Sequence, residues 1–436
     1  MNGLMKTDCA SGPTEWSLVP RRVSGARDGF SIRLARRMVF ARLRLMTQGA
    51  LTIVEGEQRT IFGSPTSPCP LRPVVTIDDP VCYRDIAWGG SVGAGESYGR
   101  GAWNCDDLTA LIRLFVLNRA VLDGMEQGAA RLSAPLLKLM HGLRRNTKAG
   151  SRRNIAAHYD LSNEFFALML DPTMMYSCGY FVRPDSTLED ASRAKIELIC
   201  RKLHLSPDDH LLEIGTGWGG LACHAAQTVG CRVTTTTISQ AQYDWALRRV
   251  RDAGLSDRVQ VLLCDYRDLP YLDMQFDKLV SVEMIEAVGW QYYGAFFDVC
   301  RRLLKPDGLM LIQAITIDER YFQRAKRSVD FIQRVIFPGS CIPSVTSLCH
   351  AMARASDFSL LHVQDIGAHY PPTLRGWRQN IRQNLERICQ LGFGPEFLRL
   401  WEFYLSYCEG GFLERSISTA HLLFARSGWR QDPLAG

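Results

Sequence analysis

The chain has 436 residues, of which 46% are apolar and 22% are charged. That length allows two or three domains with sizeable cores, and this balance excludes a wholly disordered or fibrous protein. No stretch approaches the roughly 18 uninterrupted apolar residues that a bilayer span needs, and we expect no signal peptide. The 14 cysteines form neither a CxxC pair nor zinc-ligand spacing. They favour reduced thiols in a cytoplasmic protein, and no metal site is expected.

The net charge of +6 is concentrated at the N-terminus. Residues 1–50 hold nine basic and three acidic side chains, an excess equal to the charge of the whole chain. Within this segment four apolar residues recur at helical spacing beside arginines: Leu34, Met38, Ala41 and Leu45. This pattern predicts a basic amphipathic helix. Such a helix suits an anionic membrane surface, and it equally suits docking on its own domain with a solvated charged face.

The residues that follow predict a small α+β domain and then a linker. Alternation in Leu51–Phe62 indicates a hairpin, and Val74–Asp79 indicates a further strand. After the glycine-rich run Gly89–Gly101, the segment Asn104–Asp107 is expected to cap an apolar helix. We therefore divide the chain into a basic tail at 1–48, a small domain at 49–120, a helical basic linker at 121–152 and a larger domain at 153–430.

From about residue 205, buried strands alternate with helical patterns. Five segments are typical of such strands: Leu211–Gly215, Cys231–Thr237, Val259–Cys264, Lys278–Val282 and Leu309–Thr316. This alternation predicts a doubly wound α/β sheet of Rossmann-like type. In such sheets ligands bind at the carboxyl ends of the strands.

A glycine loop, GTGWGG at 215–220, follows the first of these strands and opens a helix. Glycines let a ligand approach the backbone closely, and the helix N-terminus offers free N–H groups. The spacing also fits a dinucleotide fingerprint, but that fingerprint expects an acid after the second strand. No acid occurs there before Asp244, so a nicotinamide cofactor is disfavoured. Glu213, in the order E-x-G-x-G, favours a site for S-adenosylmethionine (SAM).

Further motifs, in order along the chain, resemble the cyclopropane-fatty-acyl-phospholipid synthase family. They are HYDLSNEFF at 158–166, LDPTMMYSCGYF at 170–181, LLEIGTGWGG at 211–220, SVEMIEAVG at 281–289, FIQRVIFPGSCIPS at 331–344 and YLSYCEGGF at 404–412. GGSVGAGESYGRGAWNCDDL at 89–108 is similar to the small N-terminal domain of the phospholipid-acting members. The resemblance extends from about residue 50 to 430. It implies a class I methyltransferase fold for the larger domain.

The resemblance also implies an activity. Members of this family transfer the methyl group of SAM to a cis double bond in an acyl chain of a membrane phospholipid. A base, bound bicarbonate, then removes a proton so that a cyclopropane ring closes. A homodimer and a phospholipid bilayer as partner are implied as well. The basic N-terminus, the small domain and apolar segments such as Phe331–Pro338 favour peripheral association with the inner face of the cell membrane, weakened by high salt. No nucleic-acid partner is expected, because no target-recognition module is apparent.

The resemblance assigns roles to particular residues. The residues implied for the SAM site are Tyr176, Ser177, Glu213, Gly215, Gly217, Gly219, Thr237, Gln242, Tyr266 and Val282. The residues implied for the reaction and the bicarbonate site are Cys178, Glu286, Gln313, Tyr370 and Cys408. Without the resemblance, the two cysteines would be interpreted as packing residues and the tyrosine as a loop residue. Glu286 is the strongest functional candidate from the sequence alone, because burying a carboxylate in an apolar stretch costs free energy unless the group has a partner or a function.

Two positions depart from the family's pattern. Gln313 stands where a histidine often holds the bicarbonate. An amide can donate a hydrogen bond, but unlike a histidine it cannot take up and release a proton. Glu283 stands where a small residue is common, and it adds a second carboxylate near Glu286. The product is therefore left open between a cyclopropane and a methyl-branched or methylene chain. A lipid-binding protein with a decayed site, a nicotinamide oxidoreductase and a nucleic-acid methyltransferase are less favoured.

Overall fold

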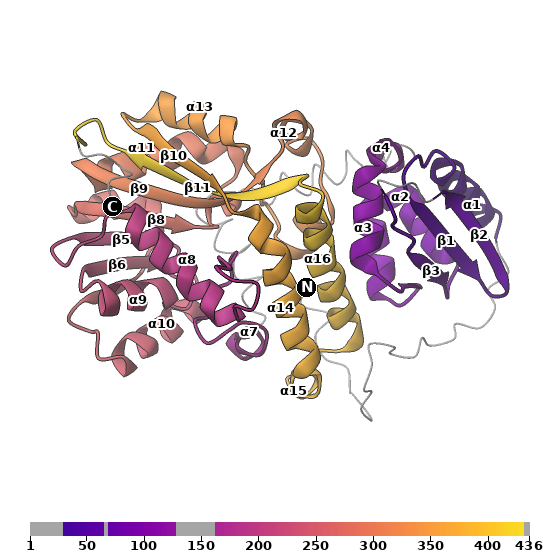
Figure 1. Cartoon of the computed structure of the whole chain (residues 1–436), viewed down its shortest axis with the longest axis horizontal. Coiled ribbons are helices and arrows are strands. Elements are labelled where there is room, and N and C mark those ends of the chain that lie inside the picture. The colour runs from indigo at the N-terminus through magenta and orange to yellow at the C-terminus, as the bar shows by residue number, and fades with distance from the viewer. Residues whose placement is uncertain (1–28, 65–68, 128–161, 431–436) are drawn as a thin grey trace. The chain divides into compact units, whose positions relative to one another are not determined.

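The computed structural model describes residues 29–64, 69–127 and 162–430. Most of the expected linker at 121–152 and the first residues of the HYDLSNEFF motif lie outside the described residues. The chain divides into two compact units (Figure 1). The first unit comprises residues 1–143, 328–338 and 381–416, and the second comprises 144–327, 339–380 and 417–436.

The first unit is an α+β domain, as expected. Its sheet has the order β2-β1-β3-β4, with β1 antiparallel to β2 and parallel to β3. The predicted hairpin and the strand after it are confirmed, and Asp107 caps α3 by accepting a hydrogen bond from the Ala110 amide. Its elements are α1 (Phe30–Leu43), β1 (Ala50–Glu55), β2 (Gln58–Gly63), β3 (Val74–Ile77), α2 (Val81–Gly99), β4 (Trp103–Cys105), α3 (Leu108–Leu117), α4 (Arg119–Gln127), η4 (Ile332–Ile336), α15 (Leu385–Gln390) and α16 (Pro395–Leu413).

Helix α1 is docked on this unit, but by a different face from the stripe seen in the sequence. The buried face consists of Ile32, Ala35, Val39, Phe40 and Leu43. The ring of Phe40 packs edge-on against the rings of Phe62 and Tyr83. The predicted stripe instead faces outward, since Leu34, Ala41 and Leu45 are exposed. The helix therefore has two apolar faces, and only one of them is covered by the described residues.

The domain boundary expected at residue 153 is wrong in one respect, because two later segments belong to the first unit. Helix α16 supplies Arg399, whose buried guanidinium donates to the carbonyl oxygens of Tyr98 at 2.7 Å and Trp103 at 2.8 Å. The same guanidinium lies 4.0 Å from the centre of the Tyr98 ring. Phe331, from the other late segment, packs on Phe403. Contacts between residues 300 positions apart leave no trace in local sequence patterns.

The second unit is built on a seven-stranded sheet of order β10-β11-β9-β8-β5-β6-β7. Strands β5 to β9 are parallel, and β11 is antiparallel to both β9 and β10. All five predicted strands are confirmed, whereas β10 and β11 were not foreseen. The helices and strands are α7 (Asn163–Met169), α8 (Leu188–Lys202), β5 (His210–Ile214), α9 (Gly220–Thr228), β6 (Arg232–Thr237), α10 (Gln240–Asp252), β7 (Val259–Leu263), η1 (Tyr266–Leu272), β8 (Phe276–Val282), η2 (Ile285–Ala287), η3 (Trp290–Tyr292), α11 (Tyr293–Leu303), β9 (Leu304–Ile317), α12 (Glu319–Ala325), α13 (Val345–Ala355), β10 (Ser359–Asp365), η5 (Gly367–His369), α14 (Tyr370–Gln383) and β11 (Ile417–Ala425).

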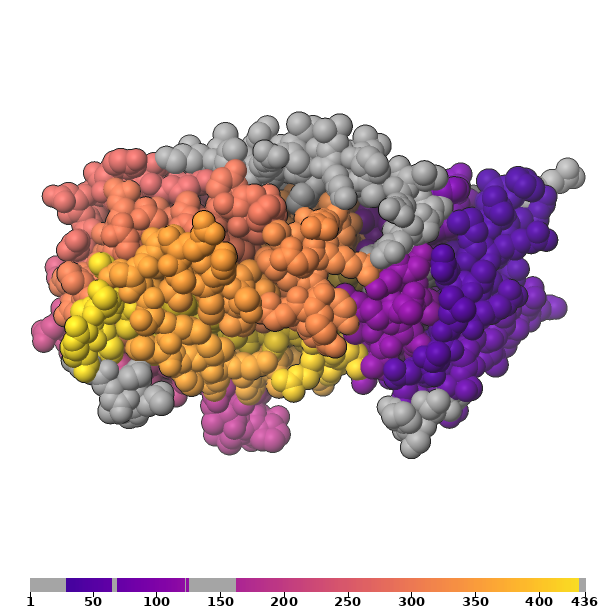
Figure 2. All heavy atoms as spheres, turned by 90° about the horizontal axis from the view of Figure 1, so that it is seen from above, coloured from indigo at the N-terminus to yellow at the C-terminus, as the bar shows by residue number. Residues whose placement is uncertain are grey.

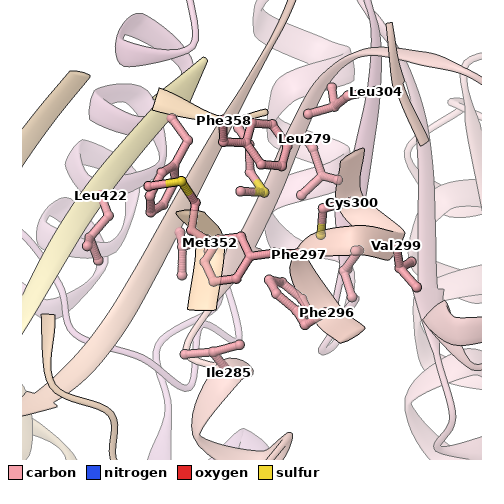
Figure 3. Close-up of a cluster of buried hydrophobic side chains, with 14 of the residues drawn as sticks. Leu279, Ile285, Phe296, Phe297, Val299, Cys300, Leu304, Met352, Phe358 and Leu422 are labelled. Atoms are coloured by element: carbon pink, nitrogen blue, oxygen red, sulfur yellow. The ribbon is translucent and has the colours of Figure 1, made fainter. Parts of the chain in front are cut away.

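Helices cover both faces of this sheet, which confirms the doubly wound architecture. One face packs against α11 and α13 in a cluster that includes Phe296, Phe297 and Met352 (Figure 3). The other face packs against α8, α9 and α10. In the space-filling view the yellow C-terminal segment lies beside orange segments, as the pairing of β11 with β10 requires (Figure 2). Because both faces are covered, the strand ends are left to carry the functional side chains.

The contacts of Arg399 predict how strongly α16 is tied to the first unit. Arg399→Ala removes two charge-assisted hydrogen bonds to buried carbonyl oxygens, of which that of Tyr98 keeps the Gly101 amide as a donor, so we expect a loss of about 2–4 kcal/mol in unfolding free energy. Urea unfolding of the whole protein measures this change. Arg387→Ala removes an exposed guanidinium from the same unit and should cost less than about 0.5 kcal/mol. Equal stability of the two variants would contradict this account of α16.

Candidate functional site

The candidate site lies at the carboxyl edge of the parallel strands. Strands β5 and β8 are neighbours in the sheet, and both end at this edge. The glycine loop follows β5, and Glu283 and Glu286 follow β8. A Cβ added to Gly215 would lie 3.5 Å from the Met284 side chain, so the loop runs against the turn after β8. Thr237 ends the strand β6, and Tyr266 begins η1 after β7. The sheet therefore brings four of the predicted segments to one edge.

The glycine loop adopts backbone conformations that residues with a Cβ disfavour. Gly215, Gly217 and Gly219 have φ values of +103°, +52° and +81°. Gly217 faces open space, since a Cβ built there would meet nothing within 4 Å. Gly220 is needed for packing, because its Cβ would lie 2.4 Å from the carbonyl oxygen of Thr173. The loop therefore offers bare backbone and the N-terminus of α9 to a ligand, as the SAM interpretation requires.

Glu213 supports this loop from within the sheet. Its carboxylate is buried on β5 and accepts a hydrogen bond from the Thr235 hydroxyl at 2.6 Å. The Thr235 hydroxyl also lies 2.7 Å from that of Thr216, inside the glycine loop. Burial raises the pKa of Glu213 to about 8, although the Thr235 hydrogen bond and the charge of Lys195 act in the opposite direction. Glu213 thus links the loop to β6 through hydroxyl groups.

The neighbouring strand ends hold the other residues expected at the SAM site. The Thr237 hydroxyl donates to Oε1 of Gln242 at 2.9 Å, so the two predicted residues form one pair. Tyr266 packs edge-on against Phe296, and burial raises the pKa of its hydroxyl. Val282 ends β8 opposite Gln313 of β9. Thr237 and Val282 end strands, and Gln242 and Tyr266 lie in the elements that follow β6 and β7 at the same edge.

The segment after α7 brings Tyr176, Ser177 and Cys178 to the site. The ring of Tyr176 packs at a tilt against those of Phe166 and Trp377, with centroid distances of 5.3 and 5.1 Å. The Ser177 hydroxyl accepts a hydrogen bond from Nζ of Lys195 at 2.7 Å. Lys195 is fully buried on α8, and burial lowers its pKa to about 8 against the attraction of Glu283. The sequence analysis did not single out this lysine.

The carboxylate of Glu283 is the hub of the site. Its Oε1 accepts hydrogen bonds from the Cys178 amide at 3.0 Å and from Nε2 of Gln313 at 2.8 Å. Its Oε2 accepts one from the Tyr370 hydroxyl at 2.5 Å. Three residues that the resemblance assigned to a bicarbonate site therefore converge on a side chain of the protein itself. Burial raises the pKa of Glu283, while these hydrogen bonds lower it.

The backbone of Glu283 is strained. Its φ of +47° is in the left-handed region, which costs a residue with a Cβ roughly 1–2 kcal/mol. The conformation persists because the Glu283 amide donates to the carbonyl oxygen of Gln313 at 2.7 Å while the side chain is held by its three donors. Strain of this kind clusters at functional sites, where the surrounding structure enforces it.

Glu286 is the second carboxyl group at the end of β8. Its Oε1 accepts a hydrogen bond from the Ile315 amide at 2.5 Å, and Oε2 is buried without a partner among the described residues. Burial and the nearby charge of Glu283 raise the pKa of Glu286 to about 8. An unpaired buried oxygen of this kind is ready for a group that the protein does not supply, such as a cation or a hydrogen-bond donor.

Behind Glu283, a chain of polar side chains crosses the sheet. Oε1 of Gln313 lies 3.0 Å from Nε2 of His421, which is directly opposite on β11. Nδ1 of His421 lies 3.0 Å from Nζ of Lys202, at the end of α8. Burial lowers the pKa of His421 well below its usual range, so the ring is neutral. Neither His421 nor Lys202 was foreseen, since an isolated histidine in an apolar strand gives no signal.

Cys408 is the one predicted site residue that belongs to the first unit. It lies on α16, where burial and the charge of Asp330 raise the pKa of its thiol. Its expected role near the bicarbonate site stays a prediction. The other predicted residues all belong to the second unit.

The donor set expected for bicarbonate does not leave room for that anion. The Cys178 amide has one hydrogen and the Tyr370 hydroxyl has one, and both point to Glu283. The two Nε2 hydrogens of Gln313 are directed to Glu283 and, at 3.4 Å, to the carbonyl oxygen of Cys178. Bicarbonate would have to displace the carboxylate or bind beside a like charge.

The chain is similar in sequence to proteins named for the modification of lipids. The profile of the mycolic acid cyclopropane synthetase family matches residues 146–422. A tuberculostearic acid methyltransferase of Mycobacterium tuberculosis is 35% identical over 353 residues, which cover 79% of this chain and 81% of that protein. A cyclopropane-fatty-acyl-phospholipid synthase of Escherichia coli is 35% identical over 355 residues, which cover 81% of this chain and 87% of that protein.

Solved structures of cyclopropane synthases are also similar to this chain. A mycolic acid cyclopropane synthase complexed with SAH and CTAB aligns with a TM-score of 0.57 and 32% identity, over 63% of this chain and 98% of that one. Another cyclopropane synthase, from Mycobacterium tuberculosis, aligns with a TM-score of 0.57 and 29% identity, over the same shares.

Substitutions at two glycines of the loop should affect stability and SAM affinity separately. Gly220→Ala forces its Cβ against the Thr173 carbonyl oxygen, so we expect a loss of about 1–3 kcal/mol in stability. Gly217→Ala places its Cβ in open space on the ligand side, so SAM affinity should fall at least tenfold with a stability loss of about 1 kcal/mol. Thermal unfolding and calorimetric SAM titration measure the two effects. If Gly217→Ala binds SAM normally, the loop is not the ligand-binding surface.

Proposed function

The chain belongs to the mycolic acid cyclopropane synthetase family, and from that membership we propose that it builds a cyclopropane ring across the cis double bond of unsaturated acyl chains in membrane phospholipids. It is a SAM-dependent methyltransferase of the cyclopropane-fatty-acyl-phospholipid synthase type. The observation that carries the proposal is the pair Glu283 and Glu286 beside the glycine loop. The Glu283 carboxylate, held by the Tyr370 hydroxyl, supplies negative charge to a largely buried site.

When bound, SAM supplies an electrophilic methyl group. The residues of the chain meet the demands that follow when an alkene accepts that group. Methylation leaves a positive charge on the acyl chain, and the Glu283 carboxylate stabilises it, joined by Glu286 at a pH above the raised pKa of about 8 of that carboxyl group. The face of Tyr176 adds the attraction of an aromatic ring for a cation. Buried neighbours such as Cys178 and Gln313 exclude water, which would otherwise capture the cation as an alcohol.

The last step removes a proton from the new methyl group and closes the ring. The resemblance implies bicarbonate as the base for this step. In this chain the expected donors of bicarbonate already serve Glu283. The proposal therefore does not require that anion.

A second product is supported by particular observations. Gln313 replaces the histidine expected at the bicarbonate site, and Glu283 introduces an additional carboxylate. Relatives of comparable similarity include proteins named as methyltransferases: a tuberculostearic acid methyltransferase and a probable fatty acid methyltransferase of Pseudomonas putida. If a hydride shift precedes proton loss, the same site yields a methylene or methyl-branched chain. The first methyl transfer is common to both outcomes.

Access to the lipid is proposed to involve α1. None of the helices in the described ranges is long and apolar enough to cross a bilayer. The outward face of α1 carries Phe30 and Leu34, and Leu45 is exposed just after the helix; Arg37 on the helix and Arg44 at its C-cap are also exposed. An apolar stripe flanked by cations suits the surface of an anionic bilayer. We therefore propose peripheral association with the inner face of the cell membrane. The homodimer implied by the resemblance stays a prediction that light scattering tests.

Expression in a host that has cis-monoenes and lacks cyclopropanes tests the reaction. We expect phospholipid acyl chains to gain one CH₂ unit, to keep one ring or double-bond equivalent and to resist mild hydrogenation. Mass spectrometry before and after hydrogenation measures these properties. The Glu286→Gln variant should make at least about 100-fold less product, because the cation loses a carboxylate. A gain of CH₂ that hydrogenation still reduces would indicate a methylene product, and a gain of CH₂ with two further hydrogens a saturated branch.

Vesicle binding tests the role of α1. Each arginine near an anionic surface contributes about 1 kcal/mol, so Arg37→Gln/Arg44→Gln should weaken binding about 30-fold at low salt. Cosedimentation with anionic vesicles at increasing salt measures this effect. The control Arg232→Gln/Arg251→Gln removes the same charge from exposed positions of the second unit. If both double variants lose the same affinity, or if salt has no effect, α1 is not the docking surface.

A further inference from the structure

The carboxylate of Glu283 makes the hydrogen bonds that a free anion would need at this site. Its two oxygens receive the Cys178 amide, the Gln313 amide group and the Tyr370 hydroxyl. A planar carboxylate and a planar bicarbonate present similar pairs of oxygens to such donors. Because each donated hydrogen is already used, the protein side chain and the free anion compete for one position.

The orientation of Gln313 follows from the polar chain behind it. An ammonium group only donates, so Lys202 donates to Nδ1 of His421. The neutral ring then carries its hydrogen on Nε2 and donates it to Oε1 of Gln313. This leaves the Nε2 amide of Gln313 to donate one hydrogen to Glu283 and the other to the carbonyl oxygen of Cys178. The chain of donors thus ends on the carboxylate and favours its ionised form.

We infer that Glu283 is a built-in replacement for bicarbonate and is the base that removes the proton after methyl transfer, so that the enzyme works without dissolved bicarbonate. The inference rests on the proposed methyl transfer and deepens it. It holds for a ring product and for a methylene product, because both require loss of one proton from the methylated chain.

The step balances within the site. Methyl transfer leaves a cationic carbon next to the carbon that carries the new methyl group. One oxygen of Glu283 takes a proton from that methyl group, and the electron pair of the broken C–H bond forms the bond to the cationic carbon. The cyclopropane ring closes, and Glu283 becomes a carboxylic acid. It returns its proton to water after the product leaves, and no oxidant or reductant is involved.

Burial makes Glu283 a suitable base. It raises the pKa of this carboxyl group above its ordinary value, and a base with a higher pKa accepts a proton more readily. The pKa of the neighbouring Glu286 is raised in the same direction, but its carboxyl group accepts the Ile315 amide of β9 and none of the three donors that converge on Glu283. Fully buried Lys195 balances part of the charge of Glu283 from α8.

The backbone conformation of Glu283 allows a substitution that separates the carboxylate from its donors. Because Glu283 has a φ of +47°, glycine fits this position without strain. Glu283→Gly removes the carboxylate and frees its three donors for an external anion. Glu283→Gln fills the same space with an amide that is not a base. The two variants therefore separate loss of the base from loss of the side chain.

Activity is measured in buffer stripped of CO₂, with and without added millimolar bicarbonate, and SAM affinity is measured calorimetrically as the check on folding. The wild-type rate should be the same in both buffers. Glu283→Gln and Glu283→Gly should both bind SAM and lose at least about 100-fold in rate, the usual contribution of a general base. Added bicarbonate should restore at least about tenfold to Glu283→Gly and nothing to Glu283→Gln. Asp185→Asn, at an exposed carboxylate, should match the wild type throughout.

Three outcomes would overturn the inference. The first is a wild-type enzyme that stops in stripped buffer and recovers with bicarbonate. The second is a Glu283→Gln variant with normal rate, since the carboxylate would then be structural. The third is a Glu283→Gly variant that binds SAM but is not rescued, since its donors would then not form an anion site. A wild-type protein that transfers no methyl group under any condition would instead refute the proposed function.

Discussion

A carboxylate placed at the end of a buried strand must be matched by hydrogen-bond donors, and that requirement at Glu283 organises the second unit. The donors come from the segment after α7, from β9 and from the start of α14. Each is held by another feature of the fold. The pairing of β8 with β9 sets Gln313 opposite Val282, and the pairing of β9 with β11 sets His421 opposite Gln313. Sheet register therefore determines the chemistry at its edge.

The site concentrates charge that a soluble core would normally avoid. Glu213, Glu283 and Glu286 all have raised pKa values because burial penalises their ionised forms. Buried Lys195 has a lowered pKa for the same reason. Such an arrangement costs stability, and buried ionisable groups of this kind cluster at functional sites. A reaction that passes through a positive charge on an apolar chain uses it, because the carboxylates are already in place when that charge develops.

The two units carry different functional features. The second unit holds the glycine loop and the carboxylates, in a sheet covered on both faces. The first unit carries α1, which buries one apolar face and exposes another beside arginines. A helix that needed only to dock on its own unit would gain nothing from Phe30, Leu34 and Leu45 on its outer side. An exposed stripe of this kind fits the proposed docking on a lipid surface.

Local patterns in the sequence determined the five parallel strands, the cap of α3 and the glycine loop, because these features depend on residues that are neighbours along the chain, whereas β10 and β11 gave no such pattern. The resemblance also identified Cys178, Gln313 and Tyr370 as members of one site. Only the tertiary structure decided what they bind. Their hydrogen bonds to Glu283 span 105, 30 and 87 positions. In the same way, periodicity revealed the helix α1, whereas its buried face was decided by Phe62 and Tyr83, which pack against it. Long-range packing and strand register decide such contacts, and neither is written in any short segment.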